Sequence, residues 1–128
     1  MTFLSLLLAF KISVSVMLLC IPLLFLGKRI LDNIFDLEDS SIVFYRLYGV
    51  AILALVAAYV GGFVAATAGR FPNEIVYMGV VSNLGSFTVM AVTGYIRRRP
   101  LTATLFGLIG VGFVVAAFIP DFAMAILW

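Results

Sequence analysis

The sequence contains no histidine and only one cysteine, Cys20. Without an imidazole side chain the protein has no histidine ligand for haem or chlorophyll. A lone cysteine excludes a disulfide within the chain, a His/Cys zinc site and a Cys–His nucleophile pair. We therefore expect no cofactor, no metal site and no catalytic residue, and we interpret Cys20 as a small apolar packing residue.

Charged side chains are also scarce. Lysine and arginine number eight and aspartate and glutamate six, so 11% of the 128 residues are charged, compared with about 25% in an ordinary soluble domain. The net charge of +2 is too small for a nucleic-acid-binding surface, and we expect it to describe membrane orientation instead.

Long apolar runs are what the sequence does contain. Hydrophobic residues make up 65% of the chain, and the mean hydropathy is +1.26. Because one membrane crossing takes about 20 apolar residues, the chain has room for four transmembrane helices and no separate soluble domain. We predict a single all-α transmembrane domain over residues 1–128, with spans at residues 3–27, 42–68, 73–96 and 101–119.

The connections between these spans are short, which predicts an up-down-up-down four-helix bundle. Residues 69–73 and 97–100 read as tight turns, each with a proline suited to opening the next helix. The longer segment at residues 28–41 reads as a short interfacial helix with an apolar face formed by Ile30, Ile34 and Leu37.

The first span exceeds the length of a signal-peptide core, so we expect it to be retained as a helix. Pro22 lies inside this span and removes one backbone donor. We therefore expect a kink near residues 18–22.

Basic residues predict the orientation in the membrane. Residues 28–41 and 97–100 carry Lys28, Arg29, Arg97, Arg98 and Arg99, whereas the loop on the opposite side carries Arg70. Because positive loops face the cytoplasm, both basic segments are predicted to be cytoplasmic and both termini outside. The predicted location is a bacterial inner membrane.

Small residues mark the helix surfaces expected to pack. Helices in lipid associate where small side chains let backbones approach closely. Ala54, Ala58, Gly62 and Ala66 recur at every fourth position of the second span, and we expect this stripe to be the main packing face. Weaker versions of the pattern in the fourth span pair Ala103 with Gly107 and Gly112 with Ala116.

Lys11 is the charged side chain placed deepest in a predicted span. It lies roughly 12 Å along the first helix, at about 1.5 Å per residue. One interpretation is that its long side chain snorkels to the outer headgroups. The alternatives are an ion pair with Asp121 or Glu74, or contact with a bound anion.

The third span carries a small, polar face that includes Ser82, Asn83, Ser86 and Thr93. Asn83 is near the midplane, where it must form a hydrogen bond to a neighbouring helix, a water or a ligand. With Tyr59, this face can instead line a polar cavity for a headgroup, a quinone or a solute. No acidic residue lies near the centre of a span, which argues against proton-coupled transport.

Arg46 and Tyr48 begin the second span with the aromatic and basic character of an interface anchor. Arg97, Arg98 and Arg99 form a second candidate lipid-interface cluster. Arg46 has two alternative roles: contact with a lipid phosphate, or an ion pair with an acidic residue of the preceding segment, namely Asp36, Glu38 or Asp39.

Two short motifs resemble a known group of proteins. Arg46-Leu47-Tyr48-Gly49 opens the second span, and Ser82-Asn83-Leu84-Gly85 lies in the third. This pattern resembles that of small bacterial four-helix membrane proteins of the DoxX-like set. The resemblance implies a four-helix bundle and an auxiliary role in respiratory or redox assemblies, and it transfers no catalytic residue.

These observations favour a protein that is not an enzyme. We expect a non-catalytic accessory or structural subunit of a larger membrane complex, whose partners are membrane lipids and other integral membrane subunits or further copies of itself. The alternatives are a small homo-oligomeric transporter or channel and a lipid- or quinone-binding assembly factor.

Overall fold

Four helices in the computed structural model are long and apolar enough to cross a membrane: Phe3–Phe25, Ile42–Thr67, Asn73–Val92 and Pro100–Phe118. The structure describes residues 2–36 and 41–126. Within these residues every regular element is helical, apart from an isolated bridge between Thr2 and Ile126. Leu37, predicted in the apolar face of residues 28–41, and Glu38 and Asp39, predicted as candidate partners of Arg46, lie outside the described residues.

The first long helix is irregular where Pro22 was expected to disturb it. It consists of α1 (Phe3–Ser15), a π-helical turn η1 (Val16–Cys20) and α2 (Ile21–Phe25). The hydroxyl of Thr2 accepts a hydrogen bond from the amide of Ser5 and so caps α1. Since proline removes one donor from the ladder, a shift in hydrogen-bond register just before it is a common adjustment.

The first three long helices start at the predicted residues 3, 42 and 73, whereas the other limits of the long helices differ from the predicted ones by one to four residues. Helix α4 (Ile42–Thr67) is capped by Ser41, whose hydroxyl accepts from the amide of Phe44. Helix α5 (Asn73–Val92) ends four residues before the predicted position of 96, because Gly94 adopts a left-handed conformation with φ of 80°. The short α6 (Tyr95–Arg98), α7 (Pro100–Phe118) and α8 (Pro120–Ala123) follow.

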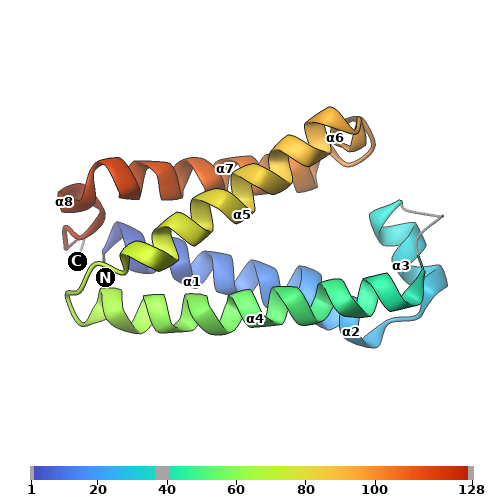
Figure 1. Ribbon diagram of the computed structural model, residues 1–128, viewed down its shortest axis with the longest axis horizontal. Coiled ribbons are helices and arrows are strands. Elements are labelled where there is room, and N and C mark those ends of the chain that lie inside the picture. Colours follow the sequence, from blue (N-terminus) through green and yellow to red (C-terminus); the bar gives the residue numbers. More distant parts are fainter. Residues whose placement is uncertain (1, 37–40, 127–128) are drawn as a thin grey trace.

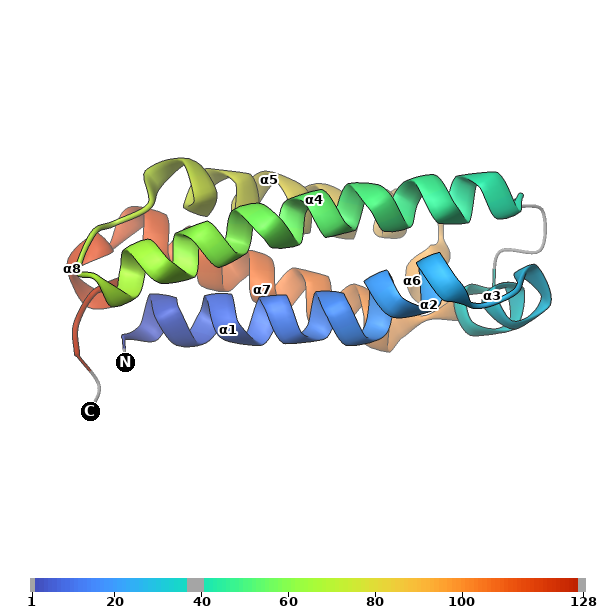
Figure 2. The ribbon, with the colours of Figure 1, turned by 90° about the horizontal axis from the view of Figure 1, so that it is seen from below.

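The long helices are arranged as two pairs (Figures 1 and 2). Helices α1 and α2 run along α4, and α5 packs on α7. Helix α5 contacts α4 near the loop between them, where Gly62 meets Ile75, and it diverges from α4 towards α6 (Figure 1). The start of α1 lies at the same end as α8, and α3 (Lys28–Phe35) and α6 lie at the opposite end.

The closest helix contact is between α5 and α7, and glycines make it possible. A Cβ added to Gly110 would lie 2.5 Å from Leu84 Cδ2 and 3.3 Å from the backbone nitrogen of Leu84. A Cβ added to Gly79 would lie 2.6 Å from the ring of Phe113. These two helices therefore approach through missing side chains, as expected for helices that associate in lipid.

The stripe predicted to be the main packing face of α4 is only partly inside. Gly62 and Ala66 are buried, Ala58 is half-buried and Ala54 is exposed. Ile52 is one of the buried residues of α4. Because it lies two residues before Ala54, the two side chains point to nearly opposite sides of a helix with 3.6 residues per turn. The expectation that the whole stripe packs inside the chain is therefore corrected.

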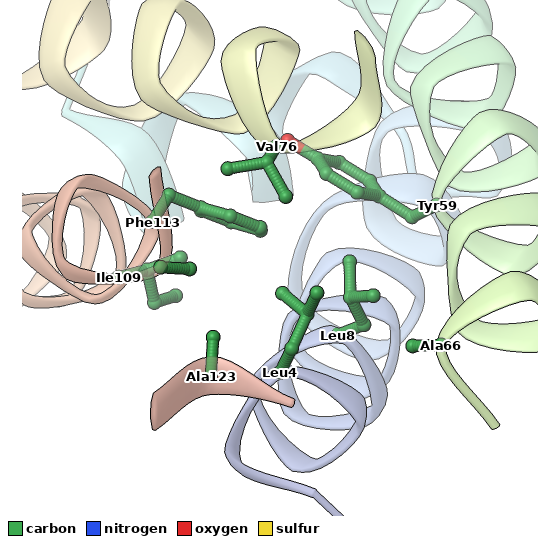
Figure 3. Close-up of a cluster of buried hydrophobic side chains, with 9 residues drawn as sticks. Leu4, Leu8, Tyr59, Ala66, Val76, Ile109, Phe113 and Ala123 are labelled. Carbon is green, nitrogen blue, oxygen red and sulfur yellow. The ribbon is translucent and has the colours of Figure 1, made fainter. Parts of the chain in front are cut away.

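The core is divided along the bundle into two clusters. One cluster, at the α8 end, joins residues of α1, α4, α5, α7 and α8, and it is shown in Figure 3. The other joins η1, α2, α3, α4 and α7. Large apolar side chains remain exposed on all four long helices, for example Phe25, Leu53, Val81 and Phe118. Such a surface is compatible with an integral membrane protein.

Helix α3 is amphipathic, and besides Ile30 and Ile34 of the predicted apolar face it carries one buried apolar residue, Leu31. Leu31 is fully buried, whereas Ile30 and Ile34 are 49% and 43% exposed. Leu31 packs in the cluster next to α2 and α4. Leu31 therefore joins α3 to the core, whereas Ile30 and Ile34 remain partly exposed.

Candidate functional site

Lys11 lies inside the bundle and is only 4% exposed. It occupies the inward face of α1 together with Leu4, Leu8 and Ser15, spaced three or four residues apart. Its ammonium nitrogen lies over the ring of Phe106, 4.8 Å from the centroid, and 5.9 Å from the centroid of the Tyr59 ring. These contacts are cation–π interactions with α7 and α4.

This position differs from two of the interpretations of Lys11. The side chain does not extend along the outer surface as a snorkelling lysine would. Asp121 and Glu74 are exposed, and among the described residues the ion pair formed by a lysine joins Lys28 to Asp32. The rotation of α1 explains the difference, because it directs Lys11 towards the centre of the bundle.

Lys11 forms part of the wall of an apolar cavity of about 160 Å³. The other lining residues come from the first helix, α3 and α7: Val14, Leu18, Leu19, Ile34, Phe35, Thr102, Leu105, Phe106 and Ile109. Among the described residues that line it, Lys11 and Thr102 are the ones with hydrogen-bonding side chains. We call this space the lysine cavity.

A second space of about 400 Å³ adjoins the lysine cavity. The two share four lining residues, Leu19, Phe35, Thr102 and Phe106. The remaining wall comes from α4, α5 and α6: Tyr48, Val89, Met90, Thr93 and Tyr95. We call this space the outer cavity. It lies where the α1–α4 and α5–α7 pairs separate, and the exposed side chains of Tyr48 and Val89 place it near the surface.

Helix α3 covers these cavities and is held in place by α6. The Tyr95 hydroxyl donates to the carbonyl of Phe35 at 2.6 Å, and Arg99 Nη2 donates to the carbonyl of Asn33 at 2.6 Å. Arg98 makes a longer contact of 3.4 Å with the carbonyl of Asp36. Helix C-terminal carbonyls lack partners within their own helix and attract cations, so α6 both caps and fixes α3.

The pKa of Tyr95 is raised, first because burial disfavours the phenolate. Of the three arginines predicted at the lipid interface, Arg97 and Arg98 are exposed, and Arg98 and Arg99 contact carbonyls of residues 33–36.

The other end of α3 is fixed to α4. Asp32 accepts a hydrogen bond from Lys28 at 2.6 Å and from the Tyr45 hydroxyl at 2.7 Å. These two donors, Lys28 first, hold the pKa of the Asp32 carboxyl below its usual value of 3.8. Arg46 Nη1 donates to the carbonyl of Leu23 at 2.6 Å, so it caps the end of α2.

The polar face of α5 is divided between different surroundings. Asn83 is fully buried, and its Nδ2 donates to the carbonyl of Gly79 at 2.7 Å and to the Tyr59 hydroxyl at 3.4 Å. The Tyr59 and Ser82 hydroxyls are 3.0 Å apart. In the part of the chain that is described, Oδ1 of Asn83 has no hydrogen-bond partner. Asn83 and Ser82 thus join α5 to α4 through Tyr59.

The rest of that face does not continue the cluster. Ser86 is half-buried and donates to the carbonyl of Ser82, and Thr93 is exposed and donates to the carbonyl of Val89. Both hydroxyls are therefore used within their own helix, although Thr93 also lines the outer cavity.

The residues that sequence reasoning missed are ordinary apolar or small polar ones. Phe106 and Thr102 shape the space beside Lys11, yet nothing in their local sequence distinguishes them from other residues of an apolar helix. Tyr59 links the two polar features: its ring faces Lys11, and its hydroxyl faces Asn83. It also stacks on Phe113, as shown in Figure 3.

Residues 2–36 and 41–126 contain no group of three or more His, Cys, Asp or Glu side chains able to hold a metal ion. No family model, no curated protein and no solved structure matches the chain. The resemblance to DoxX-like proteins therefore stays a prediction.

Proposed function

We propose that the protein is an integral membrane, up-down-up-down four-helix bundle of a bacterial inner membrane, with the α3–α6 end in the cytoplasm and both termini outside. The four long apolar helices and the position of α3 and α6 at one end support this arrangement (Figure 1). The arginines of α6 and the basic start of α3 support the orientation.

The orientation can be tested with single cysteines placed at opposite ends of a Cys20→Ser protein. A membrane-impermeant maleimide should label Asn73→Cys in intact cells and should label Asn33→Cys only after lysis. The reverse pattern would overturn the proposed orientation, and labelling of both in intact cells would overturn the proposed topology.

We further propose that the function is non-catalytic binding of a small amphipathic molecule, such as a lipid or a quinone, within the two cavities. The observation that carries this proposal is the burial of Lys11 in the wall of an otherwise apolar cavity. Binding sites for small molecules are mostly apolar and have a few polar groups that fix the orientation of the ligand. Lys11 and Thr102 are such groups in the lysine cavity.

A charged group inside an apolar region is costly unless it is paired, so such residues mark functional sites. The aromatic rings of Phe106 and Tyr59 compensate the ammonium in part. A ligand with a hydrogen-bond-accepting group would complete that compensation, and its apolar part would contact the remaining wall.

The test is extraction of the protein purified in a mild detergent, followed by mass spectrometry of the extract. We expect one apolar amphiphile at a ratio near one per chain, and a large loss of it in Lys11→Met and in the cavity-filling Val14→Phe. Arg70→Met is the control, because it removes an exposed cation outside both cavities. Equal content in all four proteins would refute the proposal.

A specific observation also favours a role as an accessory subunit. The outer surface of α4 exposes Ala54, Ala57 and Gly61, and a Cβ added to Gly61 would meet nothing within 4 Å. Small residues of this kind allow a helix of another subunit to approach. Native gels of the protein in mild detergent should then show a larger complex that Gly61→Leu disrupts and Gly85→Leu, an open position on α5, does not.

Copies that run alone in both variants and in the wild type would refute the accessory role.

The transporter alternative needs a continuous polar path. It has less support, because Ser86 and Thr93 bond within their own helix.

A further inference from the structure

We infer that the ligand of the two cavities carries a carboxylate that pairs with Lys11, and that it is a single-chain fatty acid. This inference rests on the proposed binding function and narrows it to one chemical class. The charge at the inner end of the site, the shape of the two cavities and the position of their opening each support this chemical class.

The charge requirement comes from Lys11. Its ammonium nitrogen lies between the rings of Phe106 and Tyr59, and no carboxylate of a described residue forms an ion pair with it. A buried cation is compensated best by an anion with which it can form both an ion pair and a hydrogen bond. A neutral ligand such as a quinone supplies only the hydrogen bond.

The shape favours a small anionic group. The lysine cavity is about 160 Å³, and the polar side chains that the described residues contribute to its wall are Lys11 and the hydroxyl of Thr102. A carboxylate accepts hydrogen bonds at both oxygens, so it can use the ammonium and this hydroxyl together. A phospholipid headgroup is bulkier, carries two acyl chains, and would leave several of its polar atoms against apolar wall residues.

The opening favours a single acyl chain. The outer cavity adjoins the lysine cavity, has a volume of about 400 Å³ and is walled mainly by apolar and aromatic side chains. Its exposed wall residues are Tyr48 of α4 and Val89 of α5. Helices α4 and α5 diverge towards the α6 end (Figure 1). A chain that begins at Lys11 therefore passes Phe106 and leaves between α4 and α5 towards the surrounding lipid.

The experiment uses the full chain in phosphatidylcholine nanodiscs after removal of bound lipid, with four probes: palmitate, hexadecanol, decylubiquinone and phosphatidate. Hexadecanol has the same chain as palmitate but no charge. We expect palmitate to bind at least tenfold more tightly than each of the other probes. Lys11→Met should lose this tenfold preference for palmitate over hexadecanol, Lys11→Arg should keep most of it, and Arg70→Met should match the wild type.

The outcomes separate the two proposals. Equal binding of palmitate and hexadecanol, or an unchanged preference in Lys11→Met, would overturn the carboxylate while leaving amphiphile binding intact. Tighter binding of decylubiquinone or of phosphatidate would assign the site to that ligand and would likewise overturn the carboxylate. Binding of none of the probes by a protein with wild-type helical content would overturn both proposals.

Discussion

Replacing Lys11 by methionine should have opposite effects on stability in the absence and in the presence of ligand. Methionine has nearly the length of lysine and no charge, so it keeps the contacts of the side chain with Phe106 and Tyr59 while it removes the buried ammonium. Without ligand, the variant should therefore be the more stable protein.

The size of the effect follows from two opposing contributions. A lysine near the centre of a membrane helix costs about 3 kcal/mol on insertion scales. Cation–π contacts in a desolvated site return up to about 2 kcal/mol. The net gain expected for Lys11→Met without ligand is thus about 1 kcal/mol.

Ligand should reverse this order. A ligand that binds only the folded protein stabilises it by about 2.7 kcal/mol at a concentration of 100 times its Kd. Since the variant binds palmitate weakly, the wild type should then be more stable by about 2 kcal/mol. The assay is thermal unfolding followed by helical circular dichroism, on delipidated protein with and without palmitate, and Arg70→Met is the control.

A ligand-free Lys11→Met protein that is less stable than the wild type by about 1 kcal/mol or more would contradict this prediction. Lys11 would then be a structural residue with a stabilising partner inside the fold. Parallel stability curves for the two proteins, with no reversal by palmitate, would refute the role of Lys11 in binding.

Three further measurements test how the helices that form the cavities are held. Gly110→Ala should destabilise the protein by about 1–3 kcal/mol, because the added Cβ would lie 2.5 Å from a leucine of α5. The control Gly85→Ala, at an open helical position, should be neutral or stabilising. Equal melting temperatures of the two variants would contradict this prediction. Tyr95→Phe removes the hydrogen bond to the carbonyl of Phe35 and should cost about 1 kcal/mol, seen as faster hydrogen exchange in α3 and not in α7. The pKa of Asp32 is lowered in the folded protein, so the carboxylate contributes to stability above its usual pKa of 3.8, and this contribution is lost as the pH falls through the folded-state pKa. Asp32→Asn should abolish that part of the acid dependence of unfolding. An acid profile that is unchanged in Asp32→Asn would show that the two hydrogen bonds of Asp32 do not contribute.

Much of the helical architecture was available from the sequence, because hydropathy acts locally. A run of apolar residues with no charge satisfies its backbone only as a helix in lipid, so the lengths and approximate limits of the long helices follow from composition. The ends were less accurate where a single glycine decided them. Gly94 ends α5 in a left-handed conformation, although the apolar pattern continues to residue 96.

Helix rotation was the first thing that only the tertiary structure decided. The second and fourth spans are apolar on nearly all sides, so their sequences contain no polar face that shows which side is inside. The stripe from Ala54 to Ala66 was therefore assigned inward as a whole, whereas the structure buries only its second half completely. Likewise, only the structure shows that Gly107 and Gly110 of α7 face Phe87 and Leu84 of α5.

The candidate site shows the same division. Lys11 and Asn83 stood out in the sequence because polar groups are rare in such helices, and a rare group needs a partner. Their partners could not be read from the sequence: Phe106 faces Lys11 only because α1 and α7 meet at that level, and Tyr59 reaches Asn83 only because α4 and α5 touch there. The sequence by itself determined that the chain forms long apolar helices with a few polar residues, since these properties depend on each segment alone. The tertiary structure decided which side chains meet around a cavity, since that depends on how the helices rotate and diverge.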